Sequence, residues 1–552
     1  MYKTQKYKFE AEKYEKILLK ILKAIQTEEK WDKDRLRQIQ AQHPKDGKHM
    51  FSKNDLLRGY KHLVKNNLLE PNKKIIKRIR MKPIRTQSGV TPVTVLTKPW
   101  PCPGKCIYCP NEPNMPKSYI ESEPGAQRAA ALNFDPYLQV QRRIQALKNI
   151  GHNTEKVELI VLGGSWSAYP KGYQVWFIKR CFEASNNPTE KKQSKKKNPE
   201  KKATLKELRE QQKINETAKH KCVGLSLETR PDLITKEEVI HLRSLGCTKV
   251  QIGVQTLNNK LLKLNKRDHT VKQIKKAFEL LRLAGFKIQA HWMVNLHGAT
   301  PKKDVKDFKK LWSKDFQPDE LKIYPTSVIE NTKLHELFEA GKYTPYAEET
   351  LVNLVAELKK QVPKFCRITR VMRDIPSQEI AAGTKRSNLR QLVFNKLKKE
   401  GNSCKCIRCR EIKNKEVTQE DLELQVQKYK TTISTEYFIS FVTKKDEIAG
   451  FLRLSIPKRK YQKGHFIEEL ENSAIIREIH VYGQVVPIGK EMEGKAQHLG
   501  LGTKLLERAE EIAKVQGLKK LSVISAIGTR EYYRKRGFEL EKLYMSKNLP
   551  NQ

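Results

Sequence analysis

The sequence predicts an α/β protein of several domains: a small N-terminal helical domain, a partial (β/α) barrel, a linker with clustered cysteines, and a C-terminal mixed α/β domain. Three observations support this. The chain has 552 residues, too many for one ordinary core. Short β-rich runs alternate with helical patterns between about Val93 and Asp374, and a glycine-rich turn opens an amphipathic helix near Gly500. The predicted boundaries are 1–80, 81–385, 386–418 and 419–552.

The first domain is predicted from two amphipathic patterns. Between Lys6 and Glu29, apolar residues recur at helical spacing, with lysines on the opposite face. A second helix should begin at Ser52, because Asp55 follows at capping-box spacing. We expect a basic helical domain that contacts RNA, although a solvated lysine face is the alternative.

The barrel is predicted from seven β-rich runs, each followed by a helical pattern. The runs begin near Val93, Val157, Val223, Val250, Ile288, Leu321 and Ile368. The carboxyl ends of such strands carry the functional site in barrels. The polar or small residues at these ends are Gly163, Gly164, Glu228, Arg230, Gln255, Asn295, His297, Tyr324 and Arg373. A lysine-rich stretch over 185–220 breaks the pattern and reads as a flexible, partly helical insertion.

Cys102, Cys106 and Cys109 have the spacing C-x3-C-x2-C, in the run PWPCPGKCIYCP. Three thiolates can bind three irons of a 4Fe-4S cluster and leave the fourth iron open for a ligand. A structural cluster usually takes four cysteines. The alternatives are a zinc knuckle or buried free thiols, but a set of three with no nearby histidine favours a cluster that coordinates a cofactor.

A second set, Cys404, Cys406 and Cys409, has the spacing C-x-C-x2-C. This set is compact enough for one zinc ion, and structural zinc is favoured over redox-active thiols. A fourth ligand must come from elsewhere, with Cys366 as a candidate.

Gln497, Gly500, Gly502 and Thr503 lie in the turn QHLGLGT, directly before the helical run KLLERAEEIAKVQG. Free backbone N–H groups at such a helix start suit a pyrophosphate. A lone G-x-G can also be a tight turn.

Lysine and arginine total 109 against 62 acidic residues, which gives a formal net charge of +47. This excess favours a polyanionic partner, and nucleic acid is the leading candidate. A solubilising surface is the alternative. The chain starts without an apolar signal sequence and has no apolar run of about 20 residues, so we expect a cytoplasmic protein without a membrane partner.

Two motif sets resemble known families. The three-cysteine run resembles that of radical S-adenosylmethionine (SAM) enzymes, and the turn, helix, strand KKLSVISAI and run TREYYRKRGFEL resemble GNAT acetyltransferases in their order. Their combination, with the runs MKPIRTQSGVTPVTVLTKPWPCP, KVELIVLGGSW, LSLETRPD and REIHVYG, resembles the Elongator catalytic subunit family in its single-chain bacterial and archaeal form. The expected fold is therefore a radical SAM barrel joined by a zinc-binding linker to a GNAT domain.

The resemblance implies a tRNA wobble-uridine acetyltransferase that forms 5-carboxymethyluridine in the anticodon loop. It implies SAM and a 4Fe-4S cluster on Cys102, Cys106 and Cys109, and acetyl-CoA on the second domain. The implied SAM contacts are Gly163 and Gly164, and the strand-end residues Glu228 and Gln255 are further candidates. The implied acetyl-CoA contacts are Gln497, Gly500 and Gly502, with Thr503 in the same turn, and Tyr532 and Tyr533 are implied near the thioester. Glu478 and His480 lie on a predicted strand and are candidate polar residues of the acetyltransferase cleft. Ser165 stands where related enzymes often carry an acid after two glycines.

The implied partners are the tRNA anticodon stem-loop and an electron donor, and a homodimer is compatible with the sequence. The alternative function is protein lysine acetylation with the barrel as a scaffold.

Overall fold

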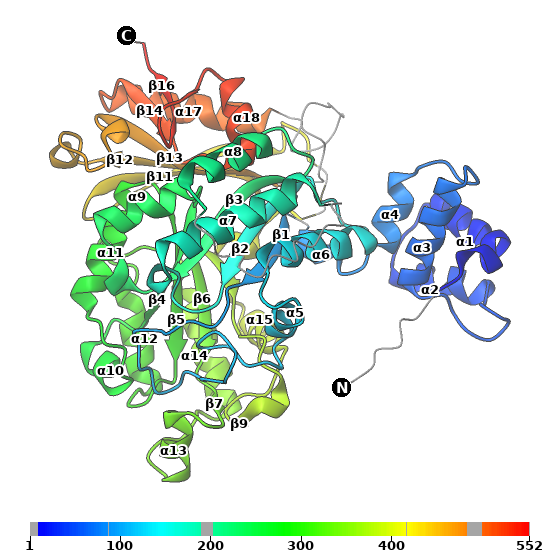
Figure 1. The fold of residues 1–552 in the computed structure, drawn as a ribbon, viewed down its shortest axis with the longest axis horizontal. Coiled ribbons are helices and arrows are strands. Elements are labelled where there is room, and N and C mark those ends of the chain that lie inside the picture. The colour runs from blue at the N-terminus through cyan, green and yellow to red at the C-terminus, as the bar shows by residue number, and fades with distance from the viewer. Residues whose placement is uncertain are drawn as a thin grey trace.

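A computed structural model describes residues 9–86, 88–188, 203–413, 415, 417–482 and 500–550. Gln497 and most of the lysine run therefore lie outside the described residues. Figure 1 shows three parts: a helical domain set to one side, a barrel, and a sheet domain across one end of the barrel. None of the helices in the described ranges has the length and hydropathy of a membrane span.

The N-terminal domain consists of α1 (Glu15–Thr27), α2 (Lys33–Gln42), α3 (Lys53–Lys65) and α4 (Lys73–Ile79). The predicted capping box is present at the start of α3, where the Asp55 N–H donates to Ser52 Oγ at 3.1 Å and the Ser52 N–H donates to Asp55 Oδ2 at 3.0 Å. Leu18, Ile21 and Leu22 are buried in a hydrophobic core that is separate from the rest of the protein. This domain packs its own interior, which agrees with the amphipathic patterns.

The barrel is one sheet of seven parallel strands in the order β1-β2-β3-β4-β5-β6-β8. Each of the seven predicted runs forms one strand. The strands are β1 (Thr91–Leu96), β2 (Lys156–Leu162), β3 (Lys221–Thr229), β4 (Lys249–Gln255), β5 (Lys287–Val294), β6 (Glu320–Pro325) and β8 (Arg367–Arg370). Since β1 and β8 do not pair, the barrel is partial and open at these two edges.

Helices cover the outside of this sheet (Figure 1). The helices of this part of the chain are α5 (Pro124–Ala130), α6 (Pro136–Asn149), α7 (Lys171–Asn186), α8 (Leu205–Asn215), α9 (Lys236–Ser244), α10 (Asn259–Leu264), α11 (Val271–Leu283), α12 (Pro301–Lys310), α13 (Lys333–Glu339), α14 (Glu348–Lys360) and α15 (Leu389–Lys399). Of these, α13 projects away from the sheet, beside β7 (Val328–Ile329). Helix α8 lies within the predicted flexible insertion, but it is an integral part of the barrel: Leu208 is fully buried, and Asn215 Nδ2 donates to Asn186 Oδ1 of α7 at 2.8 Å.

The C-terminal domain has a seven-stranded sheet in the order β10-β11-β12-β13-β14-β16-β15. Its elements are β10 (Leu422–Lys430), β11 (Ser434–Thr443), β12 (Ile448–Pro457), β13 (Ser473–Val481), α17 (Leu501–Val515), β14 (Lys520–Val523), α18 (Arg530–Arg534), β15 (Glu539–Leu540) and β16 (Met545–Asn548). β13 and β14 are parallel, and the other pairs are antiparallel. Helix α17 connects these two parallel strands, as the predicted strand–turn–helix–strand order requires.

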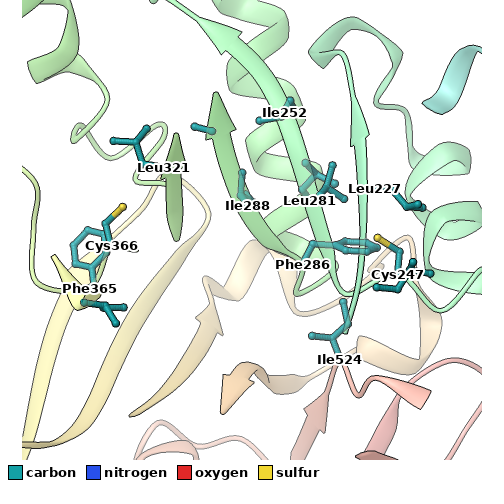
Figure 2. Packing of buried hydrophobic residues seen from close by; sticks show 14 of the residues in the cluster. Leu227, Cys247, Ile252, Leu281, Phe286, Ile288, Leu321, Phe365, Cys366 and Ile524 are labelled. Carbon is teal, nitrogen blue, oxygen red and sulfur yellow. The ribbon is translucent and has the colours of Figure 1, made fainter. Parts of the chain in front are cut away.

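The C-terminal domain covers the end of the barrel where the strands begin. Ile524 packs beneath Phe286 and Cys247 of the barrel (Figure 2). A Cβ on Gly285 would lie only 2.8 Å from Ile475 Cγ2, so the backbones approach closely at this glycine. The two domains therefore share one continuous hydrophobic core.

Buried ion pairs cross the same interface. Arg477 Nη2 lies 2.6 Å from Asp319 Oδ1, directly before β6, and both side chains are fully buried. Glu478 pairs with Lys287 at the start of β5 and with Arg453 of β12, each at 2.9 Å. Breaking one buried pair leaves an uncompensated charge, so these residues fix the domains relative to each other.

Replacing Glu478 with glutamine should lower the free energy of unfolding by about 3 kcal/mol at neutral pH, because Lys287 and Arg453 lose their shared counter-charge. The carboxyl pKa is lowered to about 2 in the folded protein. The stabilisation by this carboxylate is thus present above about pH 5 and lost as pH falls toward 2. Urea titrations of the wild type and the glutamine variant should therefore give free energies of unfolding that differ above about pH 5 and approach each other toward pH 2.

The matched control is Glu468→Gln, whose partner Lys542 and carboxylate are 77% and 82% exposed. This variant should unfold at the same urea concentration as the wild type, because water screens an exposed ion pair. Equal effects of the two substitutions would contradict an energetic role for the buried pairs.

Candidate functional site

The three cysteines of the first set lie in the loop after β1, at the opposite end of the barrel from the C-terminal domain. All three are partly exposed. Cys102 Sγ lies 3.6 Å from Ser165 Oγ, in the loop after β2. Among the described residues, the only three ligand atoms that all lie within 4.8 Å of one another belong to the second cysteine set. The three sulfurs of the first set do not meet this limit.

Arg267 connects this loop to the barrel. Its Nη1 donates to Cys106 Sγ at 3.1 Å, and its Nη2 donates to the Gly253 carbonyl of β4 at 2.7 Å. Arg230 lies beside the same loop, because a Cβ on Gly104 would be 2.1 Å from Arg230 Nη1. The sequence indicated a mouth position for Arg230, but no pattern pointed to Arg267.

Gly163 and Gly164 follow β2, as predicted. Gly163 has φ +136°, and a Cβ there would lie 1.9 Å from Thr97 Oγ1. Thr97 is held by Tyr169, whose hydroxyl is 2.8 Å from the same oxygen. Only glycine fits at this position. The turn brings the backbone after β2 close to the cysteine loop.

Glu228 and Gln255 lie at the ends of β3 and β4. Glu228 Oε1 is 3.5 Å from His291 Nδ1. Burial raises the pKa of Glu228 and lowers that of His291 well below its usual value, so the imidazole is neutral. Gln255 has φ +66°, and its Oε1 is buried without a partner in the structure. A strained residue with an unsatisfied acceptor is typical of a ligand site.

Arg373 stabilises the chain that follows the cysteines. Its Nη2 donates to the Ser118 carbonyl at 2.6 Å and to Glu123 Oε1 at 2.9 Å. Of the other predicted mouth residues, Asn295 is left-handed with φ +62°, and Tyr324 contacts His291 edge to face. His297 contacts the ring of Tyr343 edge to face.

The second site is the start of α17. Gly500 is left-handed, with φ +65°, and caps the helix. A Cβ on Gly502 would lie 2.5 Å from Tyr532 Oη, so the tyrosine covers the turn. The Arg536 guanidinium stacks 3.7 Å over the Tyr532 ring and donates to Thr503 Oγ1 at 3.2 Å. The turn, Tyr532 and Arg536 together form a cationic helix start suited to phosphate.

The two predicted tyrosines, Tyr532 and Tyr533, lie in different environments. Tyr533 is 4% exposed and packs on Phe538 with ring centroids 5.6 Å apart, so it is a core residue. Tyr532 alone faces the glycine turn.

Glu478 does not have the environment of a proton acceptor. Burial raises its pKa, but Lys287 and Arg453 outweigh this effect and lower the pKa to about 2. Its carboxylate is a charged partner in the ion pairs at the domain interface. His480 lies on the same strand, and its Nε2 is 3.0 Å from the Ser88 carbonyl before β1.

Cys404, Cys406 and Cys409 converge beside α16 (Ile407–Arg410), with ligand atoms within 4.8 Å of one another. The Cys409 N–H donates to the Cys406 carbonyl at 3.0 Å, which closes a tight turn between these two cysteines. The Cys366 carbonyl accepts from the Ile407 N–H at 3.0 Å, yet the Cys366 thiol is not part of the group.

Comparisons with known proteins agree with this architecture. Residues 102–311 match the Radical SAM superfamily, residues 318–399 the Radical_SAM C-terminal domain, and residues 407–538 the Acetyltransferase (GNAT) family. The predicted combination of a radical SAM barrel and a GNAT domain is therefore confirmed. Such domains use a 4Fe-4S cluster with SAM, and acetyl-CoA, respectively.

The chain is also similar to curated proteins over most of its length. It is 43% identical to the tRNA uridine(34) acetyltransferase of Methanocaldococcus jannaschii, over 87% of this chain and 88% of that protein. It is 41% identical to the protein of that name in Dehalococcoides mccartyi (84% and 99%), and 37% identical to Elongator complex protein 3 of Danio rerio (86% and 87%).

A solved structure, archaeal Methanocaldococcus infernus Elp3 with an N-terminal deletion, superposes with a TM-score of 0.70 at 38% identity, covering 84% of this chain and 99% of that one. Domain matches, relatives and fold agree with the paired sites at the barrel mouth and at the start of α17. The chain therefore belongs to the family of tRNA uridine(34) acetyltransferases and Elongator complex protein 3.

Proposed function

We propose that this protein is a tRNA wobble-uridine acetyltransferase that uses SAM and acetyl-CoA to form 5-carboxymethyluridine in the anticodon loop. The observation that carries the proposal is the presence of both sites in one chain, on two domains that pack against each other. The three-cysteine loop and the glycine turn of α17 lie on domains that buried ion pairs hold together. Neither ordinary acetyl transfer nor a scaffold needs both sites intact.

The residues at the mouth fit a cluster and SAM. Cys102, Cys106 and Cys109 would hold the cluster, and the unsatisfied Gln255 Oε1 and the Glu228 carboxyl offer polar contacts to SAM. A bound cluster with SAM supplies radical chemistry, which joining an acetyl methyl carbon to a uracil carbon calls for. An external electron donor is required.

The second site fits acetyl-CoA. The Gly502 N–H would bind the pyrophosphate, and Tyr532 lies beside it for the thioester end. The Thr503 N–H already donates to the Gly500 carbonyl at 2.9 Å, so Thr503 contributes through its hydroxyl, which accepts from Arg536. Cys404, Cys406 and Cys409 would hold a structural zinc ion. The net charge of +47 suits tRNA, whose loop bases can be splayed into a protein pocket.

The direct test is mass spectrometry of tRNA nucleosides after anaerobic incubation with SAM, acetyl-CoA and a reductant. We expect 5-carboxymethyluridine only when all three are present. Acetyl-lysine formed on protein without SAM, with unmodified tRNA, would favour the protein acetyltransferase instead.

Arg267→Met should shift the midpoint potential of the reconstituted cluster to a more negative value, because the cluster loses a cationic donor to the Cys106 sulfur. Arg267→Lys keeps the charge and should restore part of the shift. Redox titration followed by electron paramagnetic resonance measures both. An unchanged potential in the methionine variant at full iron content would contradict this role.

A further inference from the structure

Four arginines and one histidine gather where the N-terminal domain joins the barrel. The junction arginines are Arg80 after α4, Arg85 in the turn Pro83–Thr86, Arg128 on α5 and Arg143 on α6. His152 lies between α6 and β2. Backbone contacts hold the segments together: the Met81 N–H donates to the Ile150 carbonyl at 3.3 Å, and Thr86 Oγ1 lies 2.8 Å from His152 Nδ1.

None of the junction arginines forms an ion pair with a carboxylate of the described residues. Other inward-facing arginines have partners: Arg477 pairs with Asp319, Arg373 pairs with Glu123, and Arg243 donates to the carbonyls of Cys247 and Ser525. In addition, Arg80 Nε, Arg143 Nε and His152 Nε2 are buried atoms without a hydrogen-bond partner. His152 itself is 4% exposed. Unsatisfied buried donors beside unpaired cations indicate a missing anion.

The charges in the cluster repel one another. Burial, Arg85 and Arg128 lower the pKa of Arg143 to about 10. Burial, Arg80 and Arg85 lower the pKa of His152 to about 4, so its imidazole is neutral at pH 7. With Nδ1 directed at Thr86, a neutral His152 can donate from Nε2 without adding charge. Repulsion of this kind is relieved when an anion binds among the groups.

The position of the cluster narrows the identity of the anion. β1 is an open edge of the barrel, and α5 follows the cysteine loop in the chain. Figure 1 shows α6 between the helical domain and the barrel. The cluster thus extends from Arg80, at the end of the N-terminal domain, to Arg128, on the helix that follows the cysteine loop. Several guanidinium groups in one cluster match a polymer of phosphates better than a single small ion, since each fork can take one phosphate.

We propose that the junction arginines bind successive backbone phosphates of the substrate RNA and direct its loop toward the barrel mouth. The inference rests on the proposed tRNA function and adds a specific binding site to it.

The test compares two double variants of the full-length protein that lose the same charge. R85Q/R128Q removes two exposed junction arginines, and K302Q/K306Q removes two exposed lysines of α12, which lies away from α6 (Figure 1). We would measure tRNA affinity by fluorescence anisotropy from 50 to 300 mM salt. R85Q/R128Q should bind at least about tenfold more weakly at low salt, with a log–log salt slope reduced by about 1 to 2.

The K302Q/K306Q control should keep its slope and bind within about twofold of the wild type. Equal loss in the two double variants would show general charge attraction and overturn the site. Adding Arg143→Gln to R85Q/R128Q should lower the slope again by about 1. Melting curves of all variants establish that each is folded.

Two further measurements separate the RNA from other sources of phosphate. Calorimetry of R85Q/R128Q with acetyl-CoA should match the wild type; weaker acetyl-CoA binding with unchanged tRNA binding would assign the cluster to the cofactor and overturn the proposal. Titration with inorganic phosphate should show no saturable binding at millimolar concentrations, and tight binding together with unchanged tRNA affinity would identify a free-anion site instead.

The nucleoside assay keeps the two conclusions distinguishable. If wild-type protein forms 5-carboxymethyluridine while R85Q/R128Q binds tRNA as the control does, only the phosphate site is refuted. If wild-type protein does not modify tRNA, the proposed function itself is refuted.

Discussion

Cys106→Ala should reduce 5'-deoxyadenosine release from SAM to the background of an enzyme-free reaction. Cys106 is the central cysteine of the C-x3-C-x2-C loop, and its sulfur accepts the hydrogen bond from Arg267. Losing a ligand should exceed the roughly 10–100-fold effect of losing an outer-shell contact. Anaerobic chromatography of the nucleoside products measures release, and iron and sulfide analysis measures the cluster.

The matched control is Cys247→Ala, which removes a fully buried thiol of the same barrel that packs beside Phe286 (Figure 2). This variant should retain its iron and its activity. Deoxyadenosine release that persists in Cys106→Ala would falsify the cluster assignment.

Gly502→Glu should weaken acetyl-CoA binding by more than about 100-fold. The new Cβ would lie 2.5 Å from Tyr532 Oη, so the tyrosine must leave its place beneath Arg536. Overpacking of this kind costs about 1–3 kcal/mol, and the added carboxylate also repels the pyrophosphate. Isothermal calorimetry with acetyl-CoA measures the affinity.

Gly172→Glu is the control for the added charge, since a Cβ at Gly172 meets no atom within 4 Å. Its affinity for acetyl-CoA should equal that of the wild type. Both variants should still release deoxyadenosine when tRNA and SAM are supplied, because the cysteine loop lies at the other end of the barrel. Tight acetyl-CoA binding by Gly502→Glu would show that the turn is not the binding site.

Local sequence patterns predicted the elements well. A buried parallel strand is a short apolar run, so Val157 and Val250 each mark a strand correctly. The capping box at Ser52 is equally local. The packing of α8, within the stretch 185–220, is harder to predict from the sequence, because the many lysines obscure the apolar face that buries Leu208.

Contacts between distant residues could not be predicted in this way. Arg267 reaches Cys106 across 161 positions, and nothing in its own neighbourhood marks it. Glu478 was correctly placed on a strand, but its partner Lys287 belongs to the other domain. Tyr532 and Tyr533 are adjacent on a helix, where consecutive side chains point about 100° apart, so only one can face the turn.

The ion pairs at the domain interface also affect how this protein can be rearranged. Arg477, Asp319 and Glu478 are buried only because both halves are present. Grafting an acetyltransferase domain without an equivalent of Arg477 onto this barrel would leave Asp319 buried without its cation, and the chimera would bear that cost on every folding event. The barrel and the acetyltransferase domain should therefore be transplanted together, whereas the N-terminal domain has a core of its own.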